Sequence, residues 1–178
     1  MKKNSFLQGT LIASFAIIFI KILGALYVIP FYKIIGGLLM KKDDCIFCKL
    51  ANGQIPTNTL YEDNCVRVIF DAEPAAEGHV LILPKEHFDN IYELDDDTAA
   101  HVFKTAKKIS KAMNETLDID GLNIVQNNGE VAGQTVLHFH MHIIPRHKND
   151  TVKIGWEKHE VSSEKIKEIT EKVTKHLN

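Results

Sequence analysis

Short apolar runs recur between residues 66 and 144 with turn residues between them, a pattern that predicts the strands of a sheet. Residues 66–70 are rich in branched apolar side chains, and Pro74 and Gly78 interrupt the chain after them. The uniformly apolar run at residues 79–84 predicts a second strand. Two more strands are expected at residues 121–126 and 135–144, the last of them ended by Pro145. The letters LYED at residues 60–63 resemble a turn.

Two later segments repeat apolar residues at three and four positions, the spacing of one helix face. Residues 95–116 begin with three aspartates, which suit the positive end of a helix. A C-terminal helix is expected at about residues 163–177. The apolar stripe of the first is Val102, Ala106, Ile109, Met113 and Leu117, and that of the second is Ile166, Ile169, Val173 and Leu177. The fold class is therefore α+β, an antiparallel sheet with one long inserted helix and a C-terminal helix.

Residues 6–32 form a separate and mostly apolar segment, with Lys21 in the middle and Pro30 near the end. The segment is long enough to span a bilayer as a helix, and it resembles the first helix of a multi-span polysaccharide flippase. Two lysines precede it and three follow it, which favours a cytoplasmic location for the chain that follows. Residues 1–39 are either a membrane anchor or the result of a fusion or a misplaced start, because Met40 could itself begin a chain. Any membrane contact is expected through residues 6–32 only.

The composition divides the 178 residues into a hydrophobic segment at 1–39, a domain at 40–150, and a tail and helix at 151–178. The first part holds four lysines and no acid, so the rest carries 17 basic against 23 acidic residues, a net charge of −6. That balance excludes a protein that wraps a nucleic-acid backbone, which requires clustered positive charge. Three cysteines, an odd number, favour a reducing compartment such as the cytoplasm over a secreted disulfide framework.

The segment LHFHMHII at residues 137–144 places His138, His140 and His142 at alternate positions. On a strand the three imidazoles share one face, while the residues between them turn toward the core. They could bind one zinc ion together, supply a nucleophile oriented by its neighbours, or simply be solvated. A nearly straight row of side chains is a poor tetrahedral cap, which disfavours the first interpretation.

The loop NNGEVAGQT at residues 127–135 leads directly into the histidine row. Its two glycines are expected to leave backbone N–H groups bare and approachable, as an anion cradle requires. Beside the histidines, such a loop would hold a phosphate next to a nucleophile. This juxtaposition disfavours the interpretation of the three residues as solvated histidines.

The letters HFHMHII match the alternating signature of the histidine triad (HIT) superfamily of nucleotide hydrolases and transferases. The similarity extends over nearly all of residues 44–146, through CIFCKLANGQIP, VIFDAEPAAEGHVLILPKEHF and GLNIVQNNGEVAGQTVLHFHMHIIPR. The chain most resembles the bacterial Hint-like branch. The resemblance implies a HIT fold, a homodimer, and hydrolysis at the α-phosphate of purine nucleoside phosphoramidates or related nucleotidyl substrates. A dinucleoside polyphosphate hydrolase and a non-catalytic nucleotide- or zinc-binding protein remain as alternatives.

The resemblance also implies roles for individual residues. His140 would be the nucleophile that forms a nucleotidyl-histidine, His142 the partner that hydrogen-bonds the phosphate oxygens, and His79 a fourth histidine beside the triad. Asp71 would bind the ribose hydroxyls. The positions around the phosphate are Asn127, Gly133, Gln134 and Thr135. Those of the base pocket are Ile46, Phe47, Leu50, Ile55 and Ile69, for which plain core packing is the alternative.

Cys45 and Cys48 form a C-x-x-C pair, which needs two further ligands to hold a structural zinc ion. The resemblance implies that His87 and His138 complete a Cys₂His₂ set. A redox pair is the alternative, disfavoured because no thioredoxin-like strand–helix–strand pattern follows it. Cys65 is expected to be a small buried apolar residue.

Overall fold

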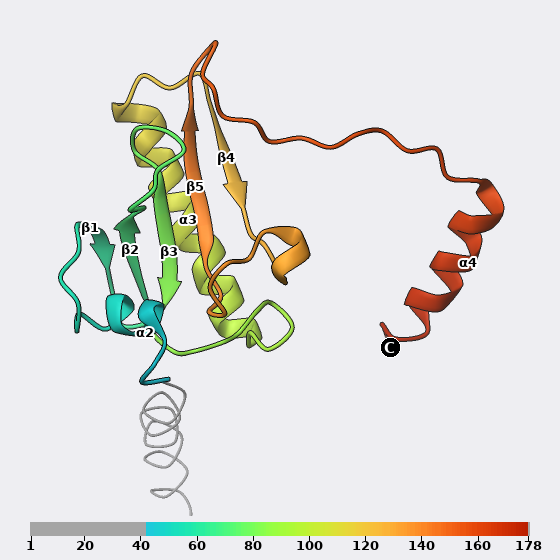
Figure 1. Ribbon diagram of the computed structural model, residues 1–178, viewed down its shortest axis with the longest axis horizontal. Helices are drawn as coiled ribbons and strands as arrows, with labels where there is room; N and C mark the ends of the chain where they lie inside the picture. The colour runs from blue at the N-terminus through green and yellow to red at the C-terminus, as the bar shows by residue number, and fades with distance from the viewer. Residues whose placement is uncertain (1–41, 178) are drawn as a thin grey trace, which may run out of the picture.

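The computed structural model describes residues 42–177, which form an antiparallel sheet with helices packed on it and a C-terminal helix set apart (Figure 1). The apolar segment 6–32 lies outside the described residues, so its predicted helix and membrane contact stay predictions. Among the described helices, none combines the length and the apolar character that a membrane crossing requires.

Five strands form the sheet in the order β1-β2-β3-β5-β4, and every neighbouring pair is antiparallel. Their bounds are β1 Thr59–Glu62, β2 Val66–Phe70, β3 Val80–Pro84, β4 Gly121–Val125 and β5 Met141–Arg146. The predicted strands at residues 66–70, 79–84 and 121–126 are confirmed within one residue. Because β5 lies between β3 and β4, the last histidine of the row is held in the interior of the sheet.

Helix α3, Asp96–Thr116, covers one face of the sheet, as its periodicity predicts. The Asp95 side chain caps it by accepting the backbone N–H of Thr98 at 2.9 Å. Its stripe is buried apart from Leu117, which follows the last turn and is 44% exposed. The stripe packs against alternate residues of three strands, namely Val66, Val68, Val80, Ile82, Met141 and Ile143. This is the main core.

A short helix that the sequence analysis did not predict, α2, spans Ile46–Ala51 and lies on the opposite face of the sheet. Its Ala51 packs in a second core with Ile69, Leu81 and Leu83. These strand residues alternate with those of the main core, and alternate residues of a strand point to opposite faces. His142 is the cross-strand partner of Leu81, so its imidazole belongs to the face that carries α2.

Two predictions of secondary structure were wrong, one of a turn and one of a strand. Residues around LYED form the edge strand β1 instead of a turn, with Tyr61 paired to Val68. The strand predicted at residues 135–144 begins only at Met141 and runs through Pro145. Pro145 lies beyond Ile143, the last β5 residue paired with β3, and its cross-strand partner is Leu122 of β4.

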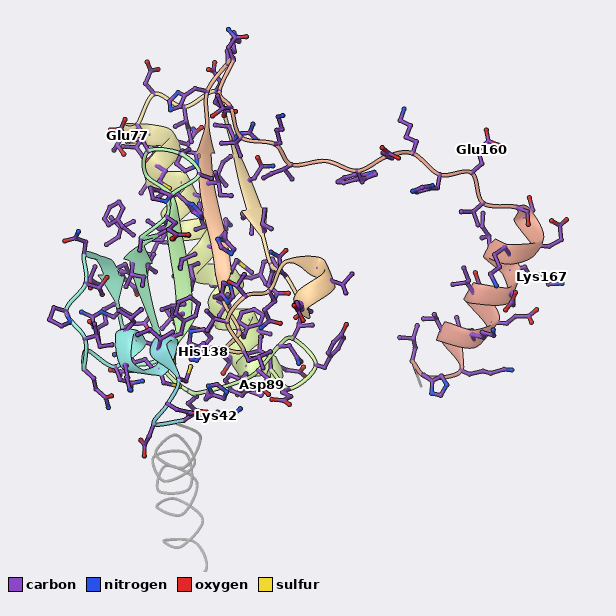
Figure 2. The ribbon with its side chains drawn as sticks, viewed as in Figure 1. Lys42, Glu77, Asp89, His138, Glu160 and Lys167 are labelled. Carbon is purple, nitrogen blue, oxygen red and sulfur yellow. The ribbon has the colours of Figure 1, made fainter. Side chains whose placement is uncertain are left out.

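Helix α4, Ser163–Thr174, stands apart from the sheet at the end of an extended segment (Figures 1 and 2). Ser162 caps it by accepting the backbone N–H of Lys165. The predicted C-terminal helix is confirmed, but no residue in it is buried. In Figure 2 Glu160 and Lys167 mark this part of the chain, well separated from His138 and Asp89 in the domain.

Candidate active site and metal centre

The three alternate histidines are divided between two clusters, so they do not act as one set. His138 and His140 precede β5 and are 0% and 4% exposed, whereas His142 lies in β5 and is partly exposed. The rings of His140 and His142 meet edge-on, with centroids 5.1 Å apart. His138 instead contacts the cysteines. Both the single zinc site on all three and the solvated row are therefore wrong.

The backbone fixes the tautomer of His140. Its Nδ1 donates a hydrogen bond to the carbonyl oxygen of His138 at 2.7 Å, and a carbonyl can only accept. The ring proton of neutral His140 therefore sits on Nδ1, which leaves the lone pair on Nε2. The Phe47 ring packs against the imidazole edge-on at 5.0 Å between centroids. A neutral imidazole with one nitrogen bound and the other available is suited to nucleophilic attack.

A second chain of hydrogen bonds fixes the opposite tautomer in His142. The backbone N–H of Ala75 donates to His79 Nδ1 at 3.0 Å, so the proton of neutral His79 is on Nε2. That Nε2–H donates to His142 Nδ1 at 3.0 Å. The proton of His142 must then sit on its own Nε2, where it can serve as a donor. His140 and His142 thus offer a lone pair and a proton side by side.

Burial keeps these imidazoles neutral. It is the main cause that lowers the pKa of His140, which the hydrogen bond to the His138 carbonyl opposes. Burial, reinforced by the neighbouring His140 and His79, lowers the pKa of His142 to about 4. The pKa of His79 is lowered by burial too, although the charge of Asp71 opposes the shift. At neutral pH the nucleophile and its neighbours are therefore uncharged.

Asp71, at the end of β2, lies beside the His79–His142 pair. Its Oδ2 is 3.5 Å from His79 Nε2 and 3.8 Å from His142 Nδ1. Its Oδ1 accepts the backbone N–H of Glu73 at 3.0 Å. The side chain is 17% exposed, so the carboxylate is reachable from the site. The expected contact with ribose hydroxyls fits this position and stays a prediction.

Three of the five apolar residues expected around the base lie together. Phe47 and Leu50 of α2 are partly buried and pack against the small core that contains Ile69. Ile69 itself is 3% exposed, so it supports the other two from beneath and presents little surface. Ile46 is 45% exposed at the start of α2, and Ile55 is partly buried after it. An apolar surface made mainly by Phe47 and Leu50 therefore adjoins His140.

The glycine loop is a closed turn, and the expectation of bare glycine amides was wrong. Gly129 and Gly133 have φ angles of 85° and 90°, which favour glycine. Between them a 3₁₀ turn, η1, spans Glu130–Ala132. The N–H of Gly133 donates to Glu130, and that of Gln134 donates to Gly129. The amides of these two residues are therefore engaged inside the loop.

Gln134 braces this loop from within. Its Oε1 accepts the N–H of Gly129 at 2.8 Å, and its Nε2 donates to the carbonyls of Asp89 and Val136 at 2.6 and 3.0 Å. Both amide protons are used, so the side chain holds the loop in place and has no proton left for a phosphate. Within the described part of the chain, the N–H of Thr135 has no hydrogen-bond acceptor. An anion could accept a hydrogen bond from it.

Asn127 also contacts the loop. Its Nδ2 lies 3.4 Å from the carbonyl oxygen of Gly133, and its side chain is partly exposed. A Cβ added at Gly133 would come within 3.4 Å of the same amide nitrogen. The small residue at 133 thus allows Asn127 to stay close to the turn.

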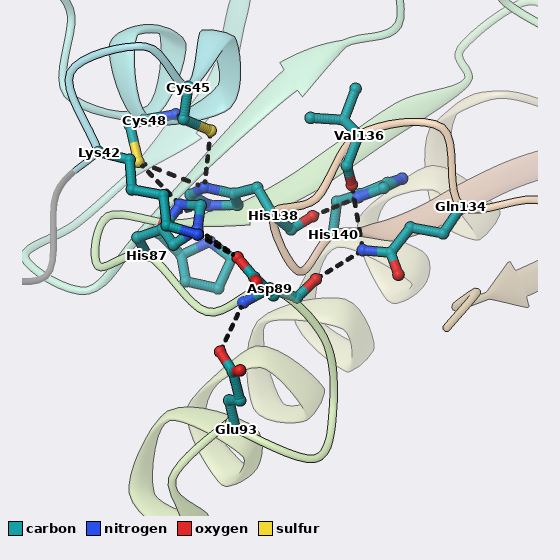
Figure 3. Close-up of polar contacts among 11 residues, drawn as sticks. Lys42, Cys45, Cys48, His87, Asp89, Glu93, Gln134, Val136, His138 and His140 are labelled. Atoms are coloured by element: carbon teal, nitrogen blue, oxygen red, sulfur yellow. Dashed lines mark hydrogen bonds and ion pairs between the residues drawn. The ribbon is translucent and has the colours of Figure 1, made fainter. Parts of the chain in front are cut away.

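Cys45, Cys48, His87 and His138 converge where α2 begins (Figure 3). Cys48 Sγ is 3.2 Å from His87 Nδ1 and 3.5 Å from His138 Nδ1, and Cys45 Sγ is 3.6 Å from His138 Nδ1. Tetrahedral zinc, with bonds of about 2.3 Å to sulfur and 2.0 Å to nitrogen, separates such atoms by about 3.6 Å. The four donors therefore fit one zinc ion.

Each imidazole of this cluster is oriented by a hydrogen bond from its Nε2–H, on the side of the ring away from the cysteines. His138 Nε2 donates to the carbonyl of Pro84 at 3.0 Å, and His87 Nε2 donates to Asp89 Oδ1 at 2.7 Å. Each Nδ1 lone pair is thus turned toward sulfur, the arrangement usual for metal-bound histidine. Lys42 Nζ pairs with Asp89 at 2.6 Å (Figure 3). Asp89 was not predicted as part of the site, although its place two residues after His87 was the available signal.

Burial raises the pKa of Cys48 to about 11. Without a cation the thiol is therefore neutral at physiological pH. A bound dication would stabilise the thiolate and release the proton.

A third group of metal-ligand side chains, Asp63, Cys65 and His101, serves the fold instead. The carboxylate of Asp63 accepts the backbone N–H groups of Cys65 and Val66, the Tyr61 hydroxyl and His101 Nε2. These bonds tie the turn between β1 and β2 to α3. Cys65 is exposed, so the prediction of a buried residue was wrong.

Known proteins resemble this chain in sequence and in fold. The HIT domain family matches residues 52–149. The adenosine 5′-monophosphoramidase hnt1 of Schizosaccharomyces pombe is 36% identical over 134 residues, which are 75% of this chain and 98% of that protein.

Two solved structures are similar as well. The crystal structure of a HIT family protein from Bacillus anthracis superposes with a TM-score of 0.72 at 38% identity, covering 78% of this chain and 100% of that one. A zinc-bound histidine triad family protein from Mycobacterium smegmatis gives a TM-score of 0.59 at 33% identity, covering 65% and 84%.

Proposed function

This chain belongs to the HIT domain family and is a hydrolase of that family, and we propose that it cleaves purine nucleoside phosphoramidates or related nucleotidyl substrates at the α-phosphate through a nucleotidyl-histidine. The observation that carries the proposal is the pair of opposite tautomers at His140 and His142. One residue offers a lone pair that can attack phosphorus, and the next offers an N–H that can hydrogen-bond the phosphate oxygens. The phosphoramidase of Schizosaccharomyces pombe supports the choice of substrate.

In the first step, His140 Nε2 attacks the α-phosphorus and the bond to the leaving nitrogen breaks. His142 Nε2–H hydrogen-bonds a phosphate oxygen and stays neutral, while the departing amine takes its proton from water. In the second step, water attacks the nucleotidyl-histidine, the bond to His140 breaks, and the proton lost by the attacking water returns to solvent. His79 is a positioning residue, since it holds His142 in the donor tautomer.

The substrate would be held on both sides of the phosphate. Asp71 would accept hydrogen bonds from the ribose hydroxyls, and Phe47 and Leu50 would contact the base. The N–H of Thr135 and the amide of Asn127 would bind the phosphate oxygens. The loop braced by Gln134 would fix their positions.

A substrate panel tests this proposal against its closest rival. An adenosine phosphoramidate and diadenosine polyphosphates should be compared at equal concentration by their kcat/KM values. The proposal expects the phosphoramidate to be preferred, whereas preference for the polyphosphates would assign the rival hydrolase. No turnover of either, with nucleoside monophosphate still bound, would leave a non-catalytic nucleotide-binding protein.

We further propose that the Cys₂His₂ cluster binds one structural zinc ion. The spacing of the donors, their burial and the acceptors behind both imidazoles support it, as does the zinc-bound relative from Mycobacterium smegmatis. The ion would attach the first turn of α2 to β3 and to the segment before β5. It would take no part in the reaction, because the His140 Nε2 that attacks phosphorus belongs to the other cluster.

We also propose a homodimer. The apolar stripe of α3 is buried in its own core, so it cannot be the contact surface between two copies. The available surface is a groove of about 540 Å³ on the outer side of α3 and β4. Phe103 and Ile124 line it and are 59% and 44% exposed. A second copy would cover these side chains.

A further inference from the structure

We propose that residues 153–177 form an arm that docks on a second copy of this chain, with the apolar stripe of α4 as its contact surface. In such a dimer the arm of each copy packs on the other copy. The inference presupposes the homodimer proposed above and is independent of the hydrolase reaction.

The first observation is the exposure of the arm. Every residue from 153 to 177 is exposed. The sole tryptophan of the chain, Trp156, is 87% exposed. The exposed fractions along the stripe are 54% for Ile166, 47% for Ile169, 51% for Val173 and 73% for Leu177. A helix of 12 residues is marginal in water without packing, so a stripe of this kind requires a partner surface.

The second observation is the way the arm leaves the domain. Both oxygens of Asp150 accept hydrogen bonds of 2.6 Å from the guanidinium of Arg146. The same guanidinium donates to the carbonyl of Val152 at 2.9 Å and to Asn123 of β4 at 2.6 Å. This bidentate arrangement fixes the start of the arm to β4. From there the arm runs past β4 and away from its own sheet (Figure 1), so its own domain is not the partner.

The third observation is what lies at that edge. β4 is an end strand of the sheet, beside the apolar groove that contains Phe103 and Ile124. A second copy seated on this groove would lie on the side toward which the arm runs. One two-fold axis then covers both the groove and the stripe of α4, because each copy supplies an arm and receives one.

Charge supports the same partner. Residues 40–150 carry 11 basic and 18 acidic residues, a net charge of −7, whereas residues 151–178 carry 6 basic and 5 acidic residues, a net charge of +1. Lys165 and Lys172 lie to one side of the stripe, where both pair with Glu168. A slightly basic arm therefore suits the acidic domain of another copy.

The test compares the full chain with two variants that each add two glutamates to α4. Ile169→Glu with Val173→Glu interrupts the stripe, while Lys167→Glu with Thr174→Glu is the control on another face of the helix. Sedimentation measures the dimer, and Trp156 fluorescence reports whether the arm is covered. We expect the emission of the unaltered chain to shift to the blue as dimer forms. The stripe variant should weaken dimerisation by about 100-fold and the control by less than about threefold.

Three results would overturn the proposal. A dimer whose Trp156 emission and tryptic cleavage at the α4 lysines do not change with protein concentration would mean that the arm is not part of the contact. A monomer with a protected arm would place α4 on its own domain. A blue shift that occurs only with vesicles of anionic phospholipid would make the stripe a membrane contact. Turnover of the phosphoramidate, measured on the same samples, decides the catalytic proposal separately.

Discussion

His140 and His142 are the same residue type two positions apart, yet their surroundings give them opposite tautomers. A carbonyl oxygen accepts a hydrogen bond from His140 Nδ1–H, and a third imidazole donates to Nδ1 of His142. The nucleophile and the hydrogen-bond donor are thus distinguished by their hydrogen bonds with His138 and His79. The chemistry we propose depends on these two bonds.

Replacing His140 with alanine should lower turnover of the phosphoramidate by at least about 1000-fold, because no other lone pair is held at that point. A nucleoside monophosphate should still bind, since Asp71, Phe47 and Leu50 are unchanged. Steady-state kinetics and calorimetric titration of the same preparation check both parts. Turnover within about tenfold of the unaltered enzyme would remove His140 from its role.

The lowered pKa values predict the pH dependence. Burial holds the pKa of His140 below 6.5, so the nucleophile stays neutral in mildly acidic solution. The acid limb of kcat/KM should therefore lie below pH 6.5. An acid limb centred above pH 6.5 would contradict the burial argument.

The stability of the folded chain should also decrease as the pH falls. A buried neutral histidine binds fewer protons than the unfolded chain does, so stability is full above pH 6.5 and falls as the pH drops toward about 4, the pKa of His142. Thermal unfolding of the His142→Gln variant should show a smaller loss between these two pH values than the unaltered chain.

At the scale of elements, periodicity predicted what long, regular segments do. α3 was found because its five apolar positions keep the helical spacing and aspartates precede it. β1 was missed because it is a four-residue edge strand that is mostly exposed, so its sequence has no alternation to recognise. The first residues of the histidine segment alternate between histidine and apolar side chains as a strand does, but their backbone groups do not pair within the sheet. The N–H of Phe139 donates to the carbonyl of Phe88, not to a sheet partner.

The features of the site are likewise divided between those that the sequence predicted and those that only the structure shows. The residue types and the spacing of the histidines indicated a phosphorus nucleophile, and the resemblance implied the four metal ligands that the structure brings together. The tautomers could not be predicted, because they depend on which ring nitrogen the folded chain brings to Ala75, Pro84 or Asp89, and residue spacing does not give that geometry. The hydrogen bonds by which Gln134 braces the loop could not be predicted for the same reason.

Helix α2 provides a prediction about metal. Six residues cannot sustain a helix alone. Cys45 and Cys48, at the start of α2, contact His87 and His138 on the segments next to β3 and β5. Elemental analysis should find about one zinc per chain. Cys48→Ser should lose the ion and lower the melting temperature by several degrees, by roughly 5 °C for each kcal/mol of lost stability.

The matched control is Cys65→Ser, which alters the exposed cysteine outside the cluster. It should keep both the zinc and the melting temperature. Equal zinc content in the two variants would show that the metal lies elsewhere. No zinc in the unaltered protein, with Cys45 and Cys48 both open to thiol reagents, would refute the site.

For the molecule as a whole, every residue assigned to catalysis, substrate or metal follows Met40. A chain beginning at Met40 should therefore keep the kcat/KM of the full chain within about twofold, since the proposed reaction uses nothing from residues 1–39. Circular dichroism would confirm that the shortened chain is folded. Activity lost from a folded shortened chain would make the N-terminal segment an integral part of the enzyme.

The central claim is double displacement at the α-phosphorus through His140, and the stereochemical course of hydrolysis tests it most directly. An adenosine phosphoramidothioate of one configuration at phosphorus would be hydrolysed in water enriched in heavy oxygen, and the configuration of the labelled thiophosphate product determined. Each in-line displacement inverts phosphorus, so two steps through a nucleotidyl-histidine predict overall retention. Overall inversion would mean that water attacks the substrate directly and that no nucleotidyl-histidine is formed.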